Sequence, residues 1–428
     1  MSWQPSRWQW RTIVRVLLLF SVGLLLSVAI ACSQDRSQSS SNPSESSSPV
    51  AELDSNQIST ELSDDSSKTD AETPSTPLPP ETQAIVDSVG PSGLYNPQRG
   101  DVRLVAISDL NGSYGSITYD PEIEKAMQLL PFWQPDMVVC SGDMVAGQDL
   151  TLTEQKMRDM WAGFEQYVAT PLRAAKVPYG FTVGNHDASS ATGVGGSFLF
   201  QKERDITTEY WGAPEHDPGV EFVDKFEFPF YYTFKHDDIF FLAWDGSSHQ
   251  IPQEKLAWVE SALASPEAQQ AKLRILLGHL PLYSVAVGRN QPGEVMAESD
   301  KLHDLLEQYD VHTYISGHHH AYYPAHRGDL QLLHMGILGS GPRPLIDSNL
   351  PAVKALTIVD VNYDTPDLTT YTTYNMETLE LIEMEQLPRF LVGHNGLLLR
   401  RDVPFDSLDA SEKGMCEQRL GSELCQAK

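Results

Sequence analysis

The feature that most constrains the fold is a pattern between about residue 100 and residue 320, where short apolar runs each end in a polar residue. Segments with helical periodicity separate these runs, and the alternation predicts an α/β fold with buried strands. Glycine precedes the polar residue in most cases. In chain order the ends are Asp109, Gly142–Asp143, Gly184–Asp187, Gly278–His279 and Gly317–His320.

The position of these residues predicts one shared site. The carboxyl ends of parallel strands meet at the same edge of a sheet, and open α/β sheets bind ligands there. Glycine permits a sharp turn and lets the backbone approach a ligand closely. One such fragment is usually only a loop or a hydrogen-bonded core residue, but five in this order indicate a site.

The residue types predict a metal site. Aspartate, asparagine and histidine offer mixed oxygen and nitrogen donors, which suit Mn, Fe or Zn and argue against a calcium cage or a thiolate site. A carboxylate can bridge two such ions, and a metal pair orients a phosphate and generates hydroxide near neutral pH. A small phosphate ester therefore fits this chemistry.

These motifs resemble those of the calcineurin-like metallophosphoesterase family, whose pattern runs D-x-H, GD, GNH[DE], GH and GHxH. The resemblance covers Asp109 to His320 and, with the flanking strands, most of residues 100–375. It implies a four-layer α/β/β/α sandwich. It also implies a dinuclear metal-dependent phosphoesterase that works by attack of metal-activated hydroxide, with a distant similarity to purple acid phosphatases.

The resemblance also implies a metal ligand set and a catalytic pair. In the ligand set Asp143 bridges two ions, Asp109 and His320 bind the first, and Asn185, His279 and His318 bind the second. His186 would contact the phosphate and protonate the leaving oxygen, and Asp187 would orient His186. His319, between two ligands, would point away from the metals.

Asn111 departs from the family pattern, which has a histidine at this position. Its amide oxygen would be a weaker, neutral ligand, or it would hydrogen-bond a water or the substrate. The third alternative is an inert loop residue, and we favour the first two. Purple acid phosphatases use a tyrosine soon after GD, but Met144 follows GD here, which leaves only Tyr114 or Tyr119 for that role.

Several neighbours of the motifs have two interpretations. Tyr283, Tyr322 and Tyr323 would either line the substrate cleft or pack in the core. Arg343 would be either a phosphate contact or a solvated loop charge. The GHNG segment at 393–396 lies outside the family pattern and predicts a turn.

The N-terminal segment predicts export. In residues 1–31, three arginines precede the charge-free apolar stretch Val16–Ala31, as in a signal peptide. Cys32 follows small residues and resembles the lipidated first residue of a bacterial lipoprotein; ordinary cleavage nearby and an uncleaved anchor are the alternatives. Residues 32–83 are rich in Ser, Asp, Glu and Pro, which predicts a disordered tether.

The remaining chain divides into a predicted catalytic domain, residues 84–391, and a C-terminal extension, residues 392–428. Cys416 and Cys425 lie close together in the extension. In an exported protein they favour a disulfide over two free thiols. Cys140 lies in an apolar run, which predicts a buried free thiol.

The formal net charge of −28 disfavours nucleic-acid binding through a basic groove. A small phosphate ester stays compatible, because metal cations supply local positive charge. We therefore predict an exported, lipid-anchored phosphoesterase that faces the periplasm or the exterior of a bacterium. The alternatives are a non-catalytic metal-binding lipoprotein, which only Asn111 supports, and a nucleotide diphosphate hydrolase.

Overall fold

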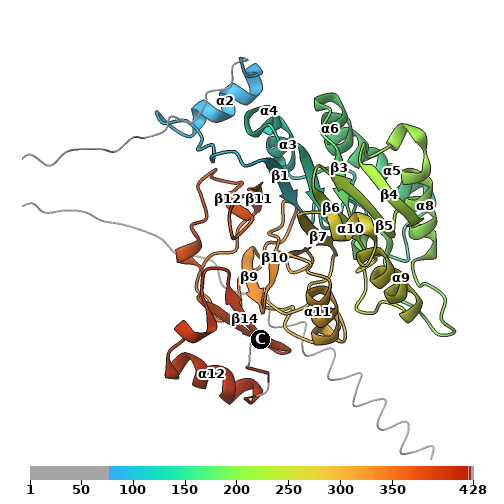
Figure 1. The fold of residues 1–428 in the computed structure, drawn as a ribbon. Coiled ribbons are helices and arrows are strands. Elements are labelled where there is room, and N and C mark those ends of the chain that lie inside the picture. Colours follow the sequence, from blue (N-terminus) through green and yellow to red (C-terminus); the bar gives the residue numbers. More distant parts are fainter. Residues whose placement is uncertain (1–76, 423, 426–428) are drawn as a thin grey trace, which may run out of the picture. The chain divides into compact units, whose positions relative to one another are not determined.

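The computed structural model describes residues 77–422, 424 and 425, and these contain two β-sheets with helices around them (Figure 1). One sheet has five strands in the order β12–β11–β1–β2–β3, and the other has nine in the order β13–β14–β9–β10–β8–β7–β6–β5–β4. The α/β class predicted from the alternating pattern is confirmed.

The bounds of the elements follow. The five-stranded sheet contains β1 (Val102–Ile107), β2 (Met137–Cys140), β3 (Tyr179–Phe181), β11 (Ala355–Val361) and β12 (Thr369–Asn375). The nine-stranded sheet contains β4 (Glu221–Glu227), β5 (Tyr231–His236), β6 (Ile239–Ala243), β7 (Leu273–Leu277), β8 (Thr313–Ser316), β9 (Tyr323–Arg327), β10 (Leu330–His334), β13 (Phe390–Gly393) and β14 (Gly396–Arg400). The helices are α2 (Pro80–Ser88), α3 (Pro121–Gln128), α4 (Leu130–Trp133), α5 (Glu154–Phe164), α6 (Thr170–Ala175), α7 (Asn185–Ala188), α8 (Gln201–Gly212), α9 (Gln253–Leu263), α10 (Pro266–Gln270), α11 (Ser299–Gln308) and α12 (Ala410–Leu420).

The burial of β1 shows how the layers stack. All six residues of this strand are buried, and side chains on its two faces enter different cores. Leu104 and Ala106 join the core that also contains residues of the nine-stranded sheet. Val105 and Ile107 join a second core with residues of α3, α5 and α8. The five-stranded sheet therefore lies between a helical layer and the other sheet.

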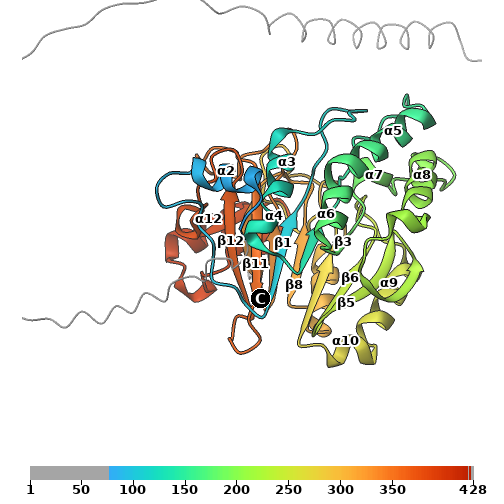
Figure 2. The same cartoon turned by 90° about the horizontal axis from the view of Figure 1, so that it is seen from above.

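Helices also cover the nine-stranded sheet. The apolar face of α9 buries Leu256, Val259 and Leu263, and α11 buries Leu302 and Leu306. Figure 2 shows α3 and α6 on one side of the strands and α9 and α10 on the other. The order is therefore helices, sheet, sheet, helices, the four-layer sandwich implied by the family resemblance.

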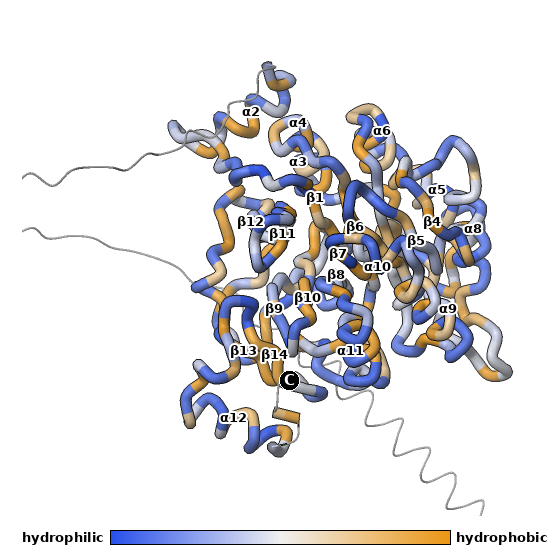
Figure 3. The backbone as a smooth tube through the Cα atoms, in the orientation of Figure 1, coloured by the Kyte–Doolittle hydropathy of each residue, from blue (hydrophilic) through white to orange (hydrophobic). Residues whose placement is uncertain are grey.

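The C-terminal segment continues the nine-stranded sheet across residues 391 and 392, where the sequence placed a domain boundary. That boundary lies inside β13, and β14 pairs with β9 of the nine-stranded sheet. All five residues of β14 are buried, in keeping with its hydrophobic colouring in Figure 3. The predicted start at residue 84 likewise lies inside α2. The GHNG turn joins β13 to β14, as expected.

The cysteine predictions are confirmed. Cys416 and Cys425 form a disulfide, and Cys140 is buried and free. No helix within the described residues is long and apolar enough to cross a membrane. The predicted export signal, Cys32 and most of the tether lie outside these residues.

A buried ion pair joins β1 to β11 in the five-stranded sheet. Arg103 donates to both carboxylate oxygens of Asp360, at 2.8 and 3.1 Å, and both side chains are almost fully buried. The guanidinium also donates to the carbonyls of Pro97 and Trp133 and to Asn96. Every polar atom of this pair is therefore engaged, so removal of one partner leaves a buried charge without compensation.

We predict that Asp360→Ala lowers the free energy of unfolding in urea by about 3–5 kcal/mol, because it leaves the buried charge of Arg103 without a partner. The exposed pair Lys272–Asp238 gives a matched control, and Lys272→Ala should change the free energy by about 1 kcal/mol or less. Equal effects of the two substitutions would contradict the role given to the buried pair.

Candidate metal centre

The two sheets place their polar strand ends around one point. In the five-stranded sheet β1, β2 and β3 are parallel neighbours, and in the other sheet β7 and β8 are parallel neighbours. Their carboxyl ends carry all five predicted motifs. The five-stranded sheet supplies the aspartates and Asn185, and the nine-stranded sheet supplies the three histidines.

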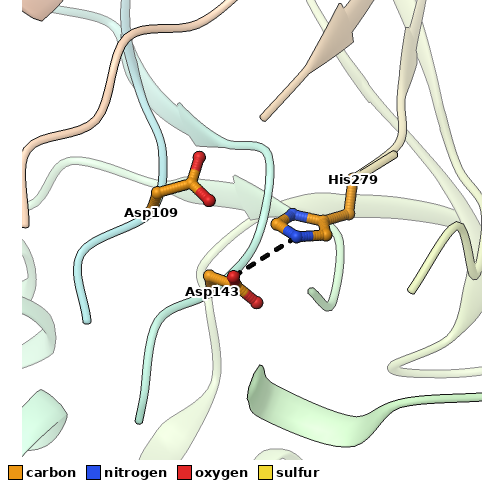
Figure 4. Close-up of side chains that lie close together, drawn as sticks. All are labelled: Asp109, Asp143 and His279. Carbon is orange, nitrogen blue, oxygen red and sulfur yellow. Dashed lines mark ion pairs between the residues drawn. The ribbon is translucent and has the colours of Figure 1, made fainter. Parts of the chain in front are cut away.

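Asp143 lies at the centre of this arrangement. Its Oδ1 accepts a hydrogen bond from the backbone N–H of His186 at 2.8 Å, and its Oδ2 lies 3.3 Å from His279 Nε2 (Figure 4). Burial acts to raise the pKa of Asp143, but His279 and His186 outweigh it and hold this pKa well below its usual range. Oδ2 is buried and accepts no hydrogen bond from the described residues.

Asp109 and His320 form one group of donors beside Asp143. The Nε2 atom of His320 lies 3.3 Å from Asp109 Oδ1. The Nδ1 atom of His320 contacts the carbonyl of Gly341 at 3.0 Å, which leaves Nε2 for a ligand. Donor atoms of Asp109, Asp143 and His279 all lie within 4.8 Å of one another, and Figure 4 shows these three side chains pointing together.

A second group of donors lies on the other side of Asp143. Asn185 Oδ1 is 2.8 Å from His279 Nε2 and 2.9 Å from His318 Nδ1. The Asn185 amide nitrogen donates to Gln148, which directs the oxygen toward the histidines. His279 Nδ1 contacts the carbonyl of Ser141 at 2.8 Å, so its Nε2 faces the centre.

The pKa values of these histidines differ in direction. Burial acts to lower the pKa of His279, but Asp143 and Asp109 raise it to about 9. Burial lowers the pKa of His318 to about 4.

The backbone at the centre is strained. Four of the predicted ligands have left-handed φ values, which are uncommon for residues other than glycine. They are Asp109 (51°), Asp143 (57°), His318 (63°) and His320 (53°).

The glycines of the motifs make room for these residues. A Cβ atom on Gly184 would lie 2.1 Å from Asp143 Oδ1, and one on Gly317 would lie 2.6 Å from Asp109 Oδ2. Only glycine therefore fits beside the two carboxylates.

His186 lies beside this centre. Its Nδ1 contacts the carbonyl of Gly147 at 2.9 Å, and its Nε2 lies 4.0 Å from Asp143 Oδ2. Among the described residues Asp187 makes no hydrogen bond to this ring, and its expected role in orienting His186 stays a prediction. Its carboxyl group accepts backbone N–H groups of Asp143, Val145 and Gly184 instead. Asp187 therefore braces the loops that carry the donors.

Asn111 is nearly buried, and its described contacts are made by its backbone. Its N–H donates to the carbonyl of Asp143 at 3.2 Å. Within residues 77–422 its side-chain amide forms no hydrogen bond. A role as metal ligand or water contact stays a prediction.

The candidate tyrosines differ in burial and in hydrogen bonding. Tyr119 donates its hydroxyl to the carbonyl of Met144 at 2.7 Å, so this group is not free to bind a metal. Tyr114 is exposed, with its ring centroid 5.2 Å from that of His186, at the rim of the centre. Tyr283 and Tyr323 are buried and bond Asp300 and a backbone carbonyl, which agrees with core packing. Tyr322 is also buried.

The structure adds two residues that the sequence analysis missed. Glu294 accepts a hydrogen bond from His318 Nε2 at 2.9 Å and pairs with Arg289. The hydrogen bond from His318 lowers the pKa of Glu294, and Arg289 adds to the shift. This carboxylate turns His318 so that Nδ1 faces Asn185. The loop has no motif that would have revealed it. His319 points away from the centre, as expected, toward the backbone of Val285 and Glu294.

We predict that Glu294→Gln weakens metal binding about 10- to 100-fold, because loss of a carboxylate behind a ligating histidine has this effect in metalloproteins. Competition with a chelator measures the change. Glu298 is exposed in the same loop and pairs only with Lys301, so Glu298→Gln is the control and should leave affinity unchanged. If the two variants hold metal equally, Glu294 does not support His318.

The donor set fits metal ions on a structural test. A buried carboxylate oxygen without a hydrogen bond is rare in proteins and requires a partner. Asp143 Oδ2 is such an atom, and it lies between two groups of oxygen and nitrogen donors. This mixture of ligands suits borderline transition metals.

The family model for calcineurin-like phosphoesterases matches residues 102–322, which is just over half of the 428-residue chain. The chain belongs to this family. The resemblance found in the motifs is thereby confirmed, and with it the class of metal-dependent phosphoric ester hydrolases.

Solved structures show similar folds at low identity. The chain is 17% identical to the purple acid phosphatase PPD1 of yellow lupin (Lupinus luteus), with a TM-score of 0.48, over 68% of this chain and 54% of the lupin protein. GAP50, the anchor in the inner membrane complex of Plasmodium, is 15% identical with a TM-score of 0.42, over 66% of this chain and 87% of GAP50. A dimetal phosphatase of Danio rerio is 13% identical with a TM-score of 0.40, over 64% of this chain and 95% of that protein. These likenesses are too weak to support an activity. No curated protein matches the chain.

Proposed function

We propose that this protein is a dinuclear metal-dependent phosphoesterase that hydrolyses a small phosphate ester outside the cytoplasm. The observation that carries the proposal is the Asp143 carboxylate. One of its oxygens is buried without a hydrogen bond between two groups of donors, which is the position of a bridging ligand. The family assignment supports the same reaction class.

Asp109 and His320 would hold one ion, and Asp143 would be shared by both ions. The other ion would be held by Asn185, His279 and His318. Bound Mn, Fe or Zn ions would supply Lewis acidity and lower the pKa of a coordinated water. Their number and identity are part of the proposal.

The protein itself would supply the proton for the leaving group. His186 Nδ1 faces the carbonyl of Gly147, so the opposite nitrogen, Nε2, is available to hold a proton. Its side chain is 15% exposed and lies at the edge of the centre. The ring of Tyr114 lies beside that of His186, with the two centroids 5.2 Å apart.

The proposal is tested with an aryl phosphate monoester and a bis-aryl phosphate diester, each assayed with Mn, Fe, Zn and Mg. Turnover that requires one of these metals supports the phosphoesterase. If metal binds but no ester is cleaved, the alternative of a metal-binding lipoprotein without catalysis is favoured.

We predict that His186→Ala keeps its metals but loses activity. The loss should be smaller for good leaving groups, which need less protonation. It is measured as kcat for a series of aryl phosphates. His236, the last residue of β5, lies at the opposite end of the strands from the site and provides the control His236→Ala. An equal loss across the series would argue against proton donation, and loss of metal would make His186 a ligand.

The location is proposed from the N-terminal sequence. The basic residues, the apolar stretch and the cysteine after small residues support export and lipid attachment at Cys32. The acidic, serine-rich segment that follows would act as a tether between the anchor and the catalytic domain.

We predict that Cys32→Ser releases the protein from bacterial membranes without a change in specific activity, because the tether separates anchor from catalysis. Membrane fractionation with an activity assay measures both. Cys140 is buried in β2 and gives the comparison Cys140→Ser, which should stay with the membrane. A Cys32→Ser protein that is cleaved but still bound to membranes would disprove lipid anchoring.

A further inference from the structure

We propose that Arg289 and Arg343 form an anion-binding subsite beside the metal centre, and that the substrate carries a second phosphate next to the phosphate that is cleaved. The inference rests on the proposed phosphoesterase function and narrows its substrate class to phosphoanhydrides such as nucleoside diphosphates. Three features of the described residues support it.

The first feature is that the Arg343 side chain has no hydrogen-bond or ion-pair partner among the described residues. Every other arginine between residues 77 and 422 makes a side-chain hydrogen bond or an ion pair. Arg343 makes none within that range, although its Nε atom is buried. The chain has 58 acidic and 30 basic residues, so carboxylates that could pair with an arginine are abundant. A buried guanidinium nitrogen without a hydrogen-bond acceptor destabilises the folded protein, unless a ligand supplies that acceptor.

The second feature is that Arg289 is only partly engaged. It pairs with Glu294 through Nη1, while its buried Nε has no hydrogen-bond partner in the part of the chain that the structure describes. A guanidinium offers five N–H donors in a planar fork. One edge of this fork is therefore held in place, and another edge remains available to an anion.

The third feature is that the fold brings the two arginines together at the centre. The N–H of Val287 donates to the carbonyl of Pro344 at 2.9 Å, which joins the two loops. Arg343 Nη1 lies 3.0 Å from the position of a Cβ on Gly288, the residue before Arg289. Burial lowers the pKa of Arg343, and the nearby charge of Arg289 adds to this shift.

Both arginines adjoin predicted metal ligands. Arg289 Nη1 lies 3.3 Å from His318 Nε2, and the backbone N–H of Arg343 donates to the carbonyl of His320 at 3.0 Å. Arg343 also lines a pocket of about 230 Å³ together with Ala321, Tyr322 and mainly apolar side chains. This pocket offers space for the organic part of a substrate that extends past Arg343.

In the proposed reaction the terminal phosphate lies at the metal centre and the inner phosphate lies between the arginines. The oxygen of water bonds to the terminal phosphorus, and the bond from that phosphorus to the bridging oxygen breaks. The bridging oxygen leaves on the nucleoside monophosphate, the inorganic phosphate keeps one proton of the water, and the other proton passes to solvent. Paired guanidinium groups stabilise the charge that develops on the leaving phosphate.

The test compares kcat/KM for ADP and for p-nitrophenyl phosphate in the wild type, Arg343→Gln and Arg343→Lys. Arg343→Gln should lower the value for ADP about ten-fold more than the value for the monoester, and Arg343→Lys should recover part of the loss. Arg99, at the opposite end of β1, pairs with Asp136, and Arg99→Gln is the control that should affect neither substrate. Equal losses for ADP and the monoester would overturn the proposal.

A binding measurement separates this inference from the proposed function. Calorimetric titration of pyrophosphate into chelator-treated protein should show binding that Arg343→Gln weakens about ten-fold. This result supports the subsite even if no substrate is turned over with any metal, which would refute only the proposed function. Pyrophosphate binding that is unchanged in Arg343→Gln would overturn the subsite.

Discussion

The buried carboxylate of Asp143 is the interaction on which the rest of the site depends. Its backbone is left-handed, its Oδ1 is fixed by the N–H of His186, and its Oδ2 faces His279. Asp187 holds the surrounding turns by accepting three backbone N–H groups. A negative charge kept at 1% exposure requires compensation, and metal ions shared with the neighbouring donors would provide it.

The donors come from both sheets, so the layers of the fold and the site depend on each other. Aspartates and Asn185 follow β1, β2 and β3, whereas the histidines follow β7 and β8. The packing of apolar side chains between the sheets fixes the distance between these two sets. The loops that carry Glu294 and Arg343 contact His318 and His320, respectively. Residues distant in sequence thus determine how the predicted ligands and the proposed anion subsite face one another.

The sequence predicted the strands and the convergence of their ends, because buried parallel strands are continuous apolar runs and glycine marks the turns beside the carboxylates. It did not predict α8 or β4. The first has a weak apolar face, and the second is an exposed edge strand without clear alternation. The contacts of Asp187 with backbone N–H groups could not be predicted, because they depend on the folded loops. The positions of Glu294, Arg289 and Arg343 could not be predicted for a similar reason, since tertiary contacts bring their loops together.

The central claim is that Asp143 is shared by two metal ions, and metal content per chain tests it most directly. Purified wild type and Asp143→Asn are dialysed against a chelator series and analysed by mass spectrometry for bound metal. Asp149→Asn is the control, because Asp149 is a half-buried neighbour whose carboxylate accepts hydrogen bonds from Thr151. The account predicts two ions in the wild type and in the control, and joint loss of both ions in Asp143→Asn. Two ions retained equally in Asp143→Asn and the wild type would contradict it.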